Sequence, residues 1–295
     1  MNQRGDIMSL SRKLGMKRSK RFHNILYHVL VCLFGFLMIY PLLWMVMSSF
    51  KESSSIFRES YRLIPDTIHF ENYINGWKGF GGYTFGVFFS NSFLIAIIAT
   101  IGAVFSSAII AFGFARLHFR GQGFWFSCVM LTMMLPFQVI MIPQFLIFKQ
   151  LCWVNTILPL TVPYFFGQAF FIFQNMQFIR GIPAELDEAA RIDGCTYYGI
   201  FLRIILPLIK PSIVTTAIFS FMWRWDDFFG ALLYLNSPAK YTLSIALKMF
   251  SDPSSQSDWG SMFAMSTLSI IPIFLIFLFF QKYLVEGIST EGLKG

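Results

Sequence analysis

The sequence has 295 residues, of which 56% are hydrophobic and only 13% are charged, and its mean hydropathy is +0.61. This composition excludes an ordinary soluble domain and is typical of a polytopic membrane protein. The net charge of +8 would suggest nucleic-acid binding in a soluble protein, but much of it lies in the first 21 residues and in the turns. Membrane orientation therefore explains the charge better, and we expect lipid, not nucleic acid, around the chain.

The N-terminal segment 1–21 carries seven Lys and Arg residues against a single acidic residue, Asp6. Such a segment is too polar to bury a core, so we expect a basic cytoplasmic arm that is disordered or rests on the lipid surface. The apolar run Ile25–Met47 follows it. Because this run is too long for the hydrophobic part of a signal peptide and no small-residue cleavage site follows, it predicts a retained first span.

Five further apolar stretches bring the prediction to six transmembrane helices within residues 22–284, and hence to an all-α fold. A hydrophilic loop, about 48–86, separates the first stretch from the second, and another covers 236–261. Prolines and amides inside the third and fourth stretches require partners within the membrane. The five stretches are 87–115, 124–148, 157–179, 209–235 and 262–284.

A polar segment, Gly181–Gly194, interrupts the apolar sequence between the fourth and fifth stretches. Pro183 suits the first turn of a helix, and Gly194 is a natural stop. Ala189 and Ala190 leave part of the surface nearly bare, which lets another protein approach closely. The segment therefore predicts a short polar helix that docks a partner, the alternative being an ordinary amphipathic surface loop. Acidic side chains complement the N-terminal end of its helix dipole: Glu185, Asp187 and Glu188.

The distribution of Lys and Arg residues predicts the orientation of the chain. Fifteen of them lie at the termini, in the turn at 116–123 and in the region 180–210, against seven on the opposite side. The positive-inside rule therefore places both termini and the polar segment in the cytoplasm. Without the N-terminal arm the count is eight against seven, so the prediction depends mainly on that arm.

The polar segment and the residues after it carry a specific resemblance. They stand at the spacing of the EAA loop in the inner-membrane permease subunits of bacterial ATP-binding-cassette (ABC) importers. More narrowly, the chain resembles the second permease of the maltose and oligosaccharide group, through residues 221–228, 237–243 and 286–295. The resemblance covers nearly the whole chain beyond the N-terminal arm. The residues at the family's spacing include Glu188, Ala189, Ala190, Asp193, Gly194, Phe201 and Pro207.

This resemblance implies a type I ABC importer permease fold, with a cytoplasmic coupling helix between spans four and five in the loop 180–207. It implies a homologous permease as heterodimer partner, two cytoplasmic ATPases and an extracytoplasmic solute-binding protein. The chain is expected to catalyse no reaction and to bind no cofactor, because the partner ATPases use ATP and Mg²⁺. We expect it in the bacterial inner (plasma) membrane, with its tail, 285–295, reaching toward the ATPases. The implied ATPase-coupling residues are Glu188, Ala189, Ala190, Arg191, Asp193, Gly194, Phe201 and Pro207.

The implied function is ATP-driven import of an oligosaccharide or related carbohydrate by alternating access. Trp225 would stack on a sugar ring or pack within the protein, and Gln138 and Asn175 would contact substrate or bond between helices. Asp226 stands where the family usually has asparagine, which leaves the charge of the sugar open. The candidate substrate-path residues are Trp225, Asp226, Gln138 and Asn175.

Charged side chains in the fifth stretch keep one other transporter class open. Arg224 and Asp227 are spaced i, i+3 and can pair on one helix face, which favours a structural role. An ion-coupled secondary transporter would need an intramembrane charge relay, for which these two residues and Asp226 are the candidates. An ABC permease for a different solute is the nearer alternative. An intramembrane enzyme is disfavoured because no H-E-x-x-H or G-x-S-x-G motif occurs, and the His and Cys spacings indicate no metal site.

Overall fold

The computed structural model describes residues 3–250 and 258–289, with side chains for 23–250 and 258–283. Within these residues the only β pairing is an isolated bridge between Phe80 and Tyr83, so the all-α prediction is confirmed. The α-helices are α1 (Gln3–Ser48), α2 (Glu71–Lys78), α3 (Phe85–Arg116), α4 (Gln122–Met134), α5 (Phe137–Gln150), α6 (Leu158–Thr161), α7 (Ala169–Arg180), α8 (Glu185–Ile192), α9 (Tyr197–Ile200), α10 (Leu206–Leu208), α11 (Lys210–Trp225), α12 (Phe229–Tyr234), α13 (Leu243–Phe250) and α14 (Trp259–Ser289). Short 3₁₀ or π turns lie at Val162–Phe166, Phe201–Ile205 and Pro238–Lys240.

All six apolar stretches are helical, but not all are single rods. Among the described residues, three helices are long and apolar enough to cross a membrane: residues 23–48 of α1, all of α3, and residues 259–283 of α14. Two bent pairs, α4 with α5 at 104° and α9–α10 with α11 at 76°, would each add a span. The expected fourth stretch is divided into α6, a 3₁₀ turn and α7. Length and hydropathy thus support three to five spans.

Prolines lie at both bends. Leu135 has extended backbone angles before Pro136, and this ends α4 where the chain turns into α5. At the second bend, the helix does not end at Pro207. A π turn precedes Pro207, and the chain stays helical at that residue. The backbone bends at Ile209, just before Pro211 in the first turn of α11. Proline is tolerated there because a first-turn N–H needs no partner within the helix.

The break before α7 lies where backbone groups find side-chain partners on α3. Gly167 has a φ of +94°, a conformation that favours glycine. The N–H of Gln168 donates to Ser107 Oγ over 3.3 Å, and Ser106 Oγ donates to the Tyr164 carbonyl over 2.9 Å. Non-helical backbone at membrane depth is tolerated only where it is satisfied in this way within the protein.

The expected fifth stretch is also divided, because its acidic residues end one helix and begin the next. α11 ends at Trp225 and α12 begins at Phe229. Asp227 Oδ1 accepts the N–H of Gly230 over 3.0 Å, and Asp227 Oδ2 lies 2.9 Å from Arg224 Nη1. The predicted Arg224–Asp227 pair is therefore confirmed, with an added role as a cap on α12.

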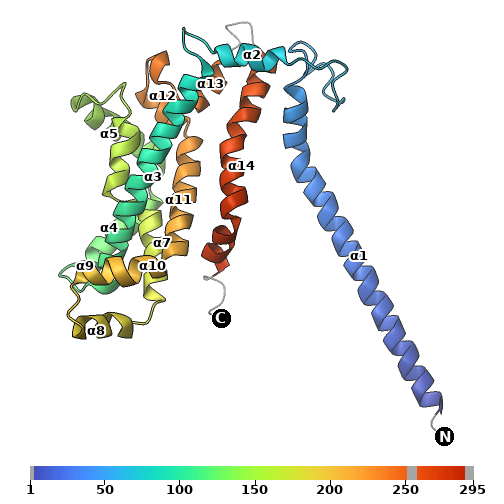
Figure 1. Ribbon diagram of the computed structural model, residues 1–295, viewed down its shortest axis with the longest axis horizontal. Helices are drawn as coiled ribbons and strands as arrows, with labels where there is room; N and C mark the ends of the chain where they lie inside the picture. The colour runs from blue at the N-terminus through green and yellow to red at the C-terminus, as the bar shows by residue number, and fades with distance from the viewer. Residues whose placement is uncertain (1–2, 251–257, 290–295) are drawn as a thin grey trace.

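α3 lies at the centre of the bundle, between α7 and α11, while α1 extends away from the other helices (Figure 1). Small residues of α3 let its neighbours approach closely; Ala96, Ala99 and Ala103 are fully buried. α1 meets the bundle only near its end, where Trp44 stacks edge-on against Phe263 of α14, 5.4 Å between ring centroids. Residues 3–21 continue α1 as helix, which does not fit the disordered alternative for the arm and leaves the lipid-surface alternative open.

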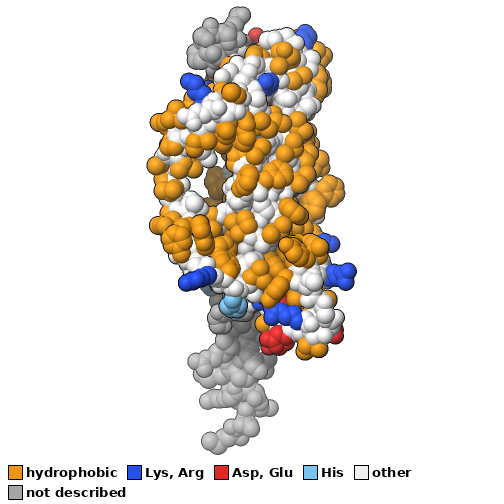
Figure 2. Space-filling model, turned by 90° about the vertical axis from the view of Figure 1, so that its left-hand side faces the viewer, with side chains coloured by type: hydrophobic (Ala, Val, Ile, Leu, Met, Phe, Trp, Pro, Cys, Tyr) orange, Lys and Arg blue, Asp and Glu red, His pale blue; other side chains and the backbone are white. Residues whose placement is uncertain are grey.

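The two ends of the bundle differ in what they carry. α8, the start of α1 and the last turns of α14 lie at one end, and α2, α12 and α13 lie at the other (Figure 1). Hydrophobic side chains cover the face between them, whereas Lys and Arg gather toward both ends and acidic side chains lie at the α8 end (Figure 2). Such a broad apolar band between charged ends is the surface expected of a membrane-embedded body.

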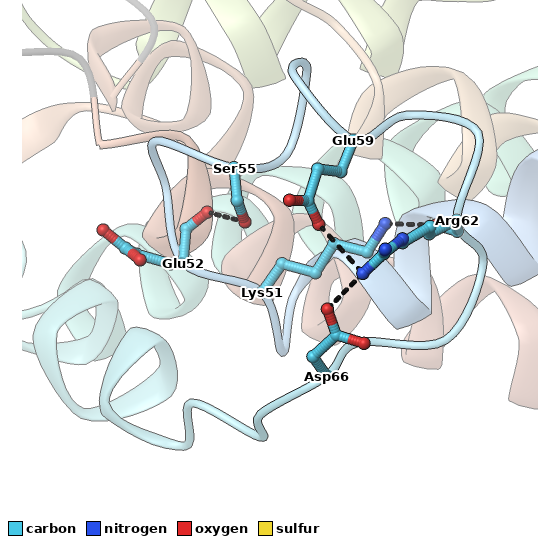
Figure 3. A network of polar contacts seen from close by, with 6 residues as sticks. All are labelled: Lys51, Glu52, Ser55, Glu59, Arg62 and Asp66. Carbon is cyan, nitrogen blue, oxygen red and sulfur yellow. Dashed lines mark hydrogen bonds and ion pairs between the residues drawn. The ribbon is translucent and has the colours of Figure 1, made fainter.

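The hydrophilic segment after α1 is folded around polar contacts (Figure 3). The Lys51 ammonium, only 4% exposed, donates to the carbonyl of Arg62. The Arg62 guanidinium in turn contacts Asp66 and lies 3.8 Å from Glu59. The side chain of Asn72 in α2, a helix that the sequence did not predict, donates to the backbone of this loop over 2.8 and 2.9 Å.

Asp258 caps the start of α14 at this same end. Its carboxylate accepts hydrogen bonds from the Ser261 N–H (3.0 Å), the Ser261 hydroxyl and the Ser53 hydroxyl (2.7 Å), and Ser53 Oγ also accepts the Gly260 N–H. Burial raises the pKa of Asp258, but these hydrogen bonds favour the ionised form and together hold the pKa below its usual value. The cap thus ties α14 to the loop after α1.

We predict that Asp258→Ala lowers the stability of the protein in detergent at neutral pH by about 1 kcal/mol, the usual cost of replacing a capping Asp by Ala. Because the folded-state pKa is depressed, the contribution of the carboxylate is complete above about pH 4 and is lost as the pH falls below it. Thermal unfolding of both proteins from pH 7 to pH 3 checks this. A wild-type excess in stability that does not shrink between pH 7 and pH 3 would contradict it.

Candidate functional site

The polar segment forms a short helix, as predicted, with its ends closed locally. α8 follows Pro183, and the chain leaves it at Gly194, which has a φ of +81°. Beyond that residue, the Cys195 N–H donates to the Ala190 carbonyl over 2.9 Å, which satisfies a C-terminal carbonyl of α8. Thr196 Oγ1 then accepts the Gly199 N–H and starts α9. The helix therefore needs little from the rest of the bundle to keep its shape.

Exposure divides the predicted coupling residues into two groups. Ala190 and Phe201 are buried, at 6% and 8% exposure, and pack in one cluster with Phe112 of α3. The expectation that Ala190 forms bare surface is therefore wrong, and only Ala189 does so. Pro207 is exposed and, with Phe201, lines an apolar groove of about 660 Å³ between α3 and α11. The coupling residues open to a partner on α8 and just after it are Glu188, Ala189, Arg191, Asp193 and Gly194.

Exposed apolar side chains surround these residues. Apolar residues after Gly194 differ in exposure, since Phe201 and Ile205 are buried whereas Tyr198 and Leu202 are exposed. Ile192 at the end of α8 is 87% exposed, and the Arg191 guanidinium lies 4.8 Å above the ring of Tyr197. Apolar side chains gathered around a polar helix are typical of a surface that meets another protein.

The sequence did not reveal one contact that a buried residue of α8 makes. Asp187, which the sequence assigned only to the helix dipole, is 5% exposed and faces Arg116 at the end of α3. Arg116 Nε lies 2.6 Å from Asp187 Oδ2, and Arg116 Nη2 donates to the Ile182 carbonyl over 2.7 Å. The signal was the i, i+3 spacing of Asp187 and Ala190, which puts both on the inward face of α8.

Trp225 and Asn175 are both buried among this chain's own residues. Trp225 is 3% exposed, its indole N–H donates to the Ser269 carbonyl over 3.1 Å, and its ring stacks on Phe221 at 18°. Asn175 is fully buried, accepts a hydrogen bond from Ser212 over 2.7 Å and donates to the Phe171 carbonyl and to Thr216 Oγ1. These contacts fit the packing and interhelical alternatives rather than substrate contact.

Asp226 and Gln138 are exposed whereas Trp225 and Asn175 are buried, so the four path candidates do not form one exposed surface in this chain. Beside Asp226, the structure reveals an exposed tryptophan that the sequence analysis did not select. Trp223 is 45% exposed and stacks on Phe171 of α7, with ring centroids 5.2 Å apart at 24°. Because Trp223 and Asp226 are spaced i, i+3, they lie on the same side of α11. That spacing was the available signal.

With this geometry described, comparison with protein families identifies the chain. The family described as binding-protein-dependent transport system inner membrane component matches residues 103–290, which include α8 and the helices that flank it. The chain is a member of this family.

Relatives with assigned names agree with this family membership. The chain is 35% identical over 264 residues to the arabinooligosaccharides transport system permease protein AraQ of Halalkalibacterium halodurans, covering 88% of this chain and 93% of that protein. It is 38% identical over 258 residues to the probable ABC transporter permease protein YurM of Bacillus subtilis, covering 87% and 84%. A subunit of a bacterial ABC transporter for the acidic polysaccharide alginate has the same fold, with a TM-score of 0.77 at 24% identity, covering 90% of this chain and 98% of that one.

Membership in the binding-protein-dependent family makes the chain a multi-pass membrane subunit of an importer with the type I permease fold. In that setting, α8 lies between the divided fourth and fifth stretches, where the resemblance placed a coupling helix. The resemblance to carbohydrate permeases is therefore confirmed at the level of the family and the fold. The roles of individual residues stay predictions.

We predict that Asn175→Leu lowers stability by about 1–3 kcal/mol, because Ser212 and Thr216 lose a buried hydrogen-bond partner. The apparent KM for the transported solute should not change, since Asn175 bonds between α7 and α11 and has no exposed surface. Thermal unfolding in detergent and uptake by reconstituted transporter measure the two effects. A raised KM at unchanged stability would instead make Asn175 a substrate contact.

Proposed function

We propose that this chain is the permease subunit of an ATP-driven importer that moves an oligosaccharide or related carbohydrate into the cytoplasm by alternating access. The observation that carries the proposal is α8, a self-closed helix at the end of the bundle with Glu188, Ala189 and Arg191 exposed. A polar helix that lies outside the apolar helical bundle presents a surface that a soluble ATPase can bind. The names of the AraQ relatives support a carbohydrate as the cargo.

The proposed assembly contains a homologous permease as heterodimer partner, two cytoplasmic ATPases and an extracytoplasmic solute-binding protein. This chain would bind no cofactor of its own, with ATP and Mg²⁺ used by the ATPases. Apolar side chains along α1 are exposed in this chain by itself; Leu33, Phe36 and Leu37 are each about 60% exposed. Their exposure supports the proposal that α1 contacts lipid or the second permease.

We propose that both termini and α8 face the cytoplasm of a bacterial inner membrane. The start of α1, the last turns of α14 and α8 lie at the same end of the molecule (Figure 1), and the Lys and Arg bias favours that end as the inner one. α2, α12 and α13 would then face the solute-binding protein. The tail 285–295, expected to reach toward the ATPases, lies largely outside the described residues.

In this proposal, ATPase closure displaces α8 and the displacement reorients the helices. The bend at Ile209 joins the α9–α10 segment to α11, which ends beside Asp226 and Trp223. Asp226 directly follows the last residue of α11, and a charged side chain that faces lipid is costly, so its exposed carboxylate favours an aqueous path on its side of α11. We place the carbohydrate path there, with Trp223 replacing Trp225 as the stacking candidate.

We predict that Glu188→Ala abolishes uptake while leaving membrane insertion intact, because its exposed side chain makes no ion pair among the described residues that folding would lose. The loss should come from weaker ATPase docking, measured as the amount of ATPase that copurifies with the permease. Glu185→Ala is the matched control, because it removes the same charge from the same helix outside the predicted coupling set. Wild-type uptake in Glu188→Ala would refute the coupling role.

We predict that Asp226→Asn raises the KM for carbohydrate uptake about fivefold, since a hydrogen bond to the substrate contributes roughly 1 kcal/mol. Stability should stay near wild type, because Asp226 is exposed and outside the Arg224–Asp227 pair. Asp227→Asn is the contrasting variant, since it removes the cap of α12 and should lower stability. An unchanged KM in Asp226→Asn would remove this residue from the path.

A further inference from the structure

The contact between Arg116 and Asp187 joins α8 to a helix that is not adjacent to it in sequence. Arg116 is the last residue of α3, and its guanidinium lies 2.6 Å from the Asp187 carboxylate while also donating to the carbonyl of Ile182, in the connection between α7 and α8. One side chain of α3 therefore holds both the start and the inward face of the α8 segment. The side chains of Arg116 and Asp187 are 11% and 7% exposed.

Each charge depends on the other. Asp187 Oδ1 is buried and has no hydrogen-bond partner among the described residues, and the contact of Arg116 Nε with Oδ2 is a close charge contact rather than an aligned hydrogen bond. Removing one partner of a buried ion pair is strongly destabilising, whereas replacing both by apolar residues is often neutral. The pair thus adds little stability over an apolar contact, but it fixes which position of α8 meets α3.

The rest of the α8 surface offers few alternatives for holding it. Asp187 and Ala190 are its two buried residues, and Ala190 belongs to an apolar cluster that includes Phe112 of α3 together with Ile200 and Phe201. The other attachments of α8 are the chain itself, through α7 on one side and α9 on the other. The Arg116–Asp187 ion pair is therefore the polar contact through which a displacement of α8 reaches α3 directly.

α3 extends from this ion pair to the proposed substrate path. At about 1.5 Å per residue, its 32 residues span roughly 48 Å. Near the far end, Phe93 of α3 packs against Trp225 with ring centroids 4.6 Å apart, next to Asp226. Between these points, α3 contacts both α7 and α11 and bonds the break before α7 through Ser107. A rigid helix with this ion pair at one end and the proposed substrate path at the other can transmit a displacement from one end to the other.

We infer that Arg116 and Asp187 are positioning residues for transport: their ion pair passes the movement of α8 to α3, and through α3 to the outer half of the path. The inference rests on the proposed coupling role of α8 and goes beyond it, because it assigns the route into the bundle to one pair of side chains. Covalent linkage through α7 and α9 would then be insufficient to reorient the outer end.

The test uses the whole transporter, assembled with its partner permease and ATPases and reconstituted in lipid. Spin labels on cysteines replacing Tyr83 and Leu232, both exposed near the outer end, report a distance in a background without the four native cysteines. The distance is measured without nucleotide and after trapping with ATP and vanadate, and ATP hydrolysis is measured on the same samples. No transported solute is needed for this readout.

Asp187→Asn keeps the shape of the side chain and removes its charge. We expect it to retain the copurifying ATPase and ATP hydrolysis but to lose most of the nucleotide-driven distance change seen in the wild type. The double variant Arg116→Met, Asp187→Leu leaves no unpaired charge, so it should fold even if Asp187→Asn does not, and it should lose the distance change as well. Arg120→Gln is the matched control, because Arg120 is exposed nearby and makes no ion pair among the described residues.

The outcomes separate this inference from the proposed function. If the double variant keeps the wild-type distance change, the role of the Arg116–Asp187 pair in transmitting movement is refuted, while the coupling role of α8 is left intact. The pair would be merely structural if Asp187→Asn and the double variant both lose the distance change, ATP hydrolysis and the copurifying ATPase together. Failure of the wild-type chain to copurify with any ATPase would instead refute the proposed function.

Discussion

Backbone polar groups that leave a helix inside hydrocarbon must find partners within the protein, and the architecture of this chain depends on how α3 and the acidic residues meet that constraint. Ser106 and Ser107 of α3 bond the backbone at the break before α7. Asp227 caps α12 after α11 has ended. These partners let the fourth and fifth stretches break without exposing unpaired N–H groups to lipid, so the bundle contains short segments that can bend and reorient.

α8 illustrates the opposite solution, a polar helix that completes its own ends and sits outside the apolar body. Gly194 and the Cys195 N–H close its C-terminus, and the acidic first turn suits its N-terminus. Few contacts hold α8 to the bundle, and Arg116 makes the only ion pair among them in the part of the chain that the structure describes.

Burial separates residues of similar chemistry into different roles. Trp225 and Trp223 lie two positions apart on α11, yet one is enclosed by Phe93 and Phe221 and the other is nearly half exposed. Asp226 and Asp227 are adjacent, but only Asp227 is paired. Helical rotation of about 100° per residue gives neighbouring side chains different surroundings, so a motif in sequence is not a site until its face is known.

The sequence by itself determined the class of the protein, because hydropathy over long stretches, the Lys and Arg bias and the spacing around Glu188 and Gly194 are properties of the chain alone. It also identified the Arg224–Asp227 pair, since i, i+3 spacing on a helix is local. It could not find the partner of Asp187, which lies 71 positions away at Arg116, nor show that Trp225 is buried whereas Trp223 is exposed. Those assignments depend on which helix faces which, and only tertiary packing around α3 decided that, because burial and long-range pairing are set by contacts between segments distant in the chain.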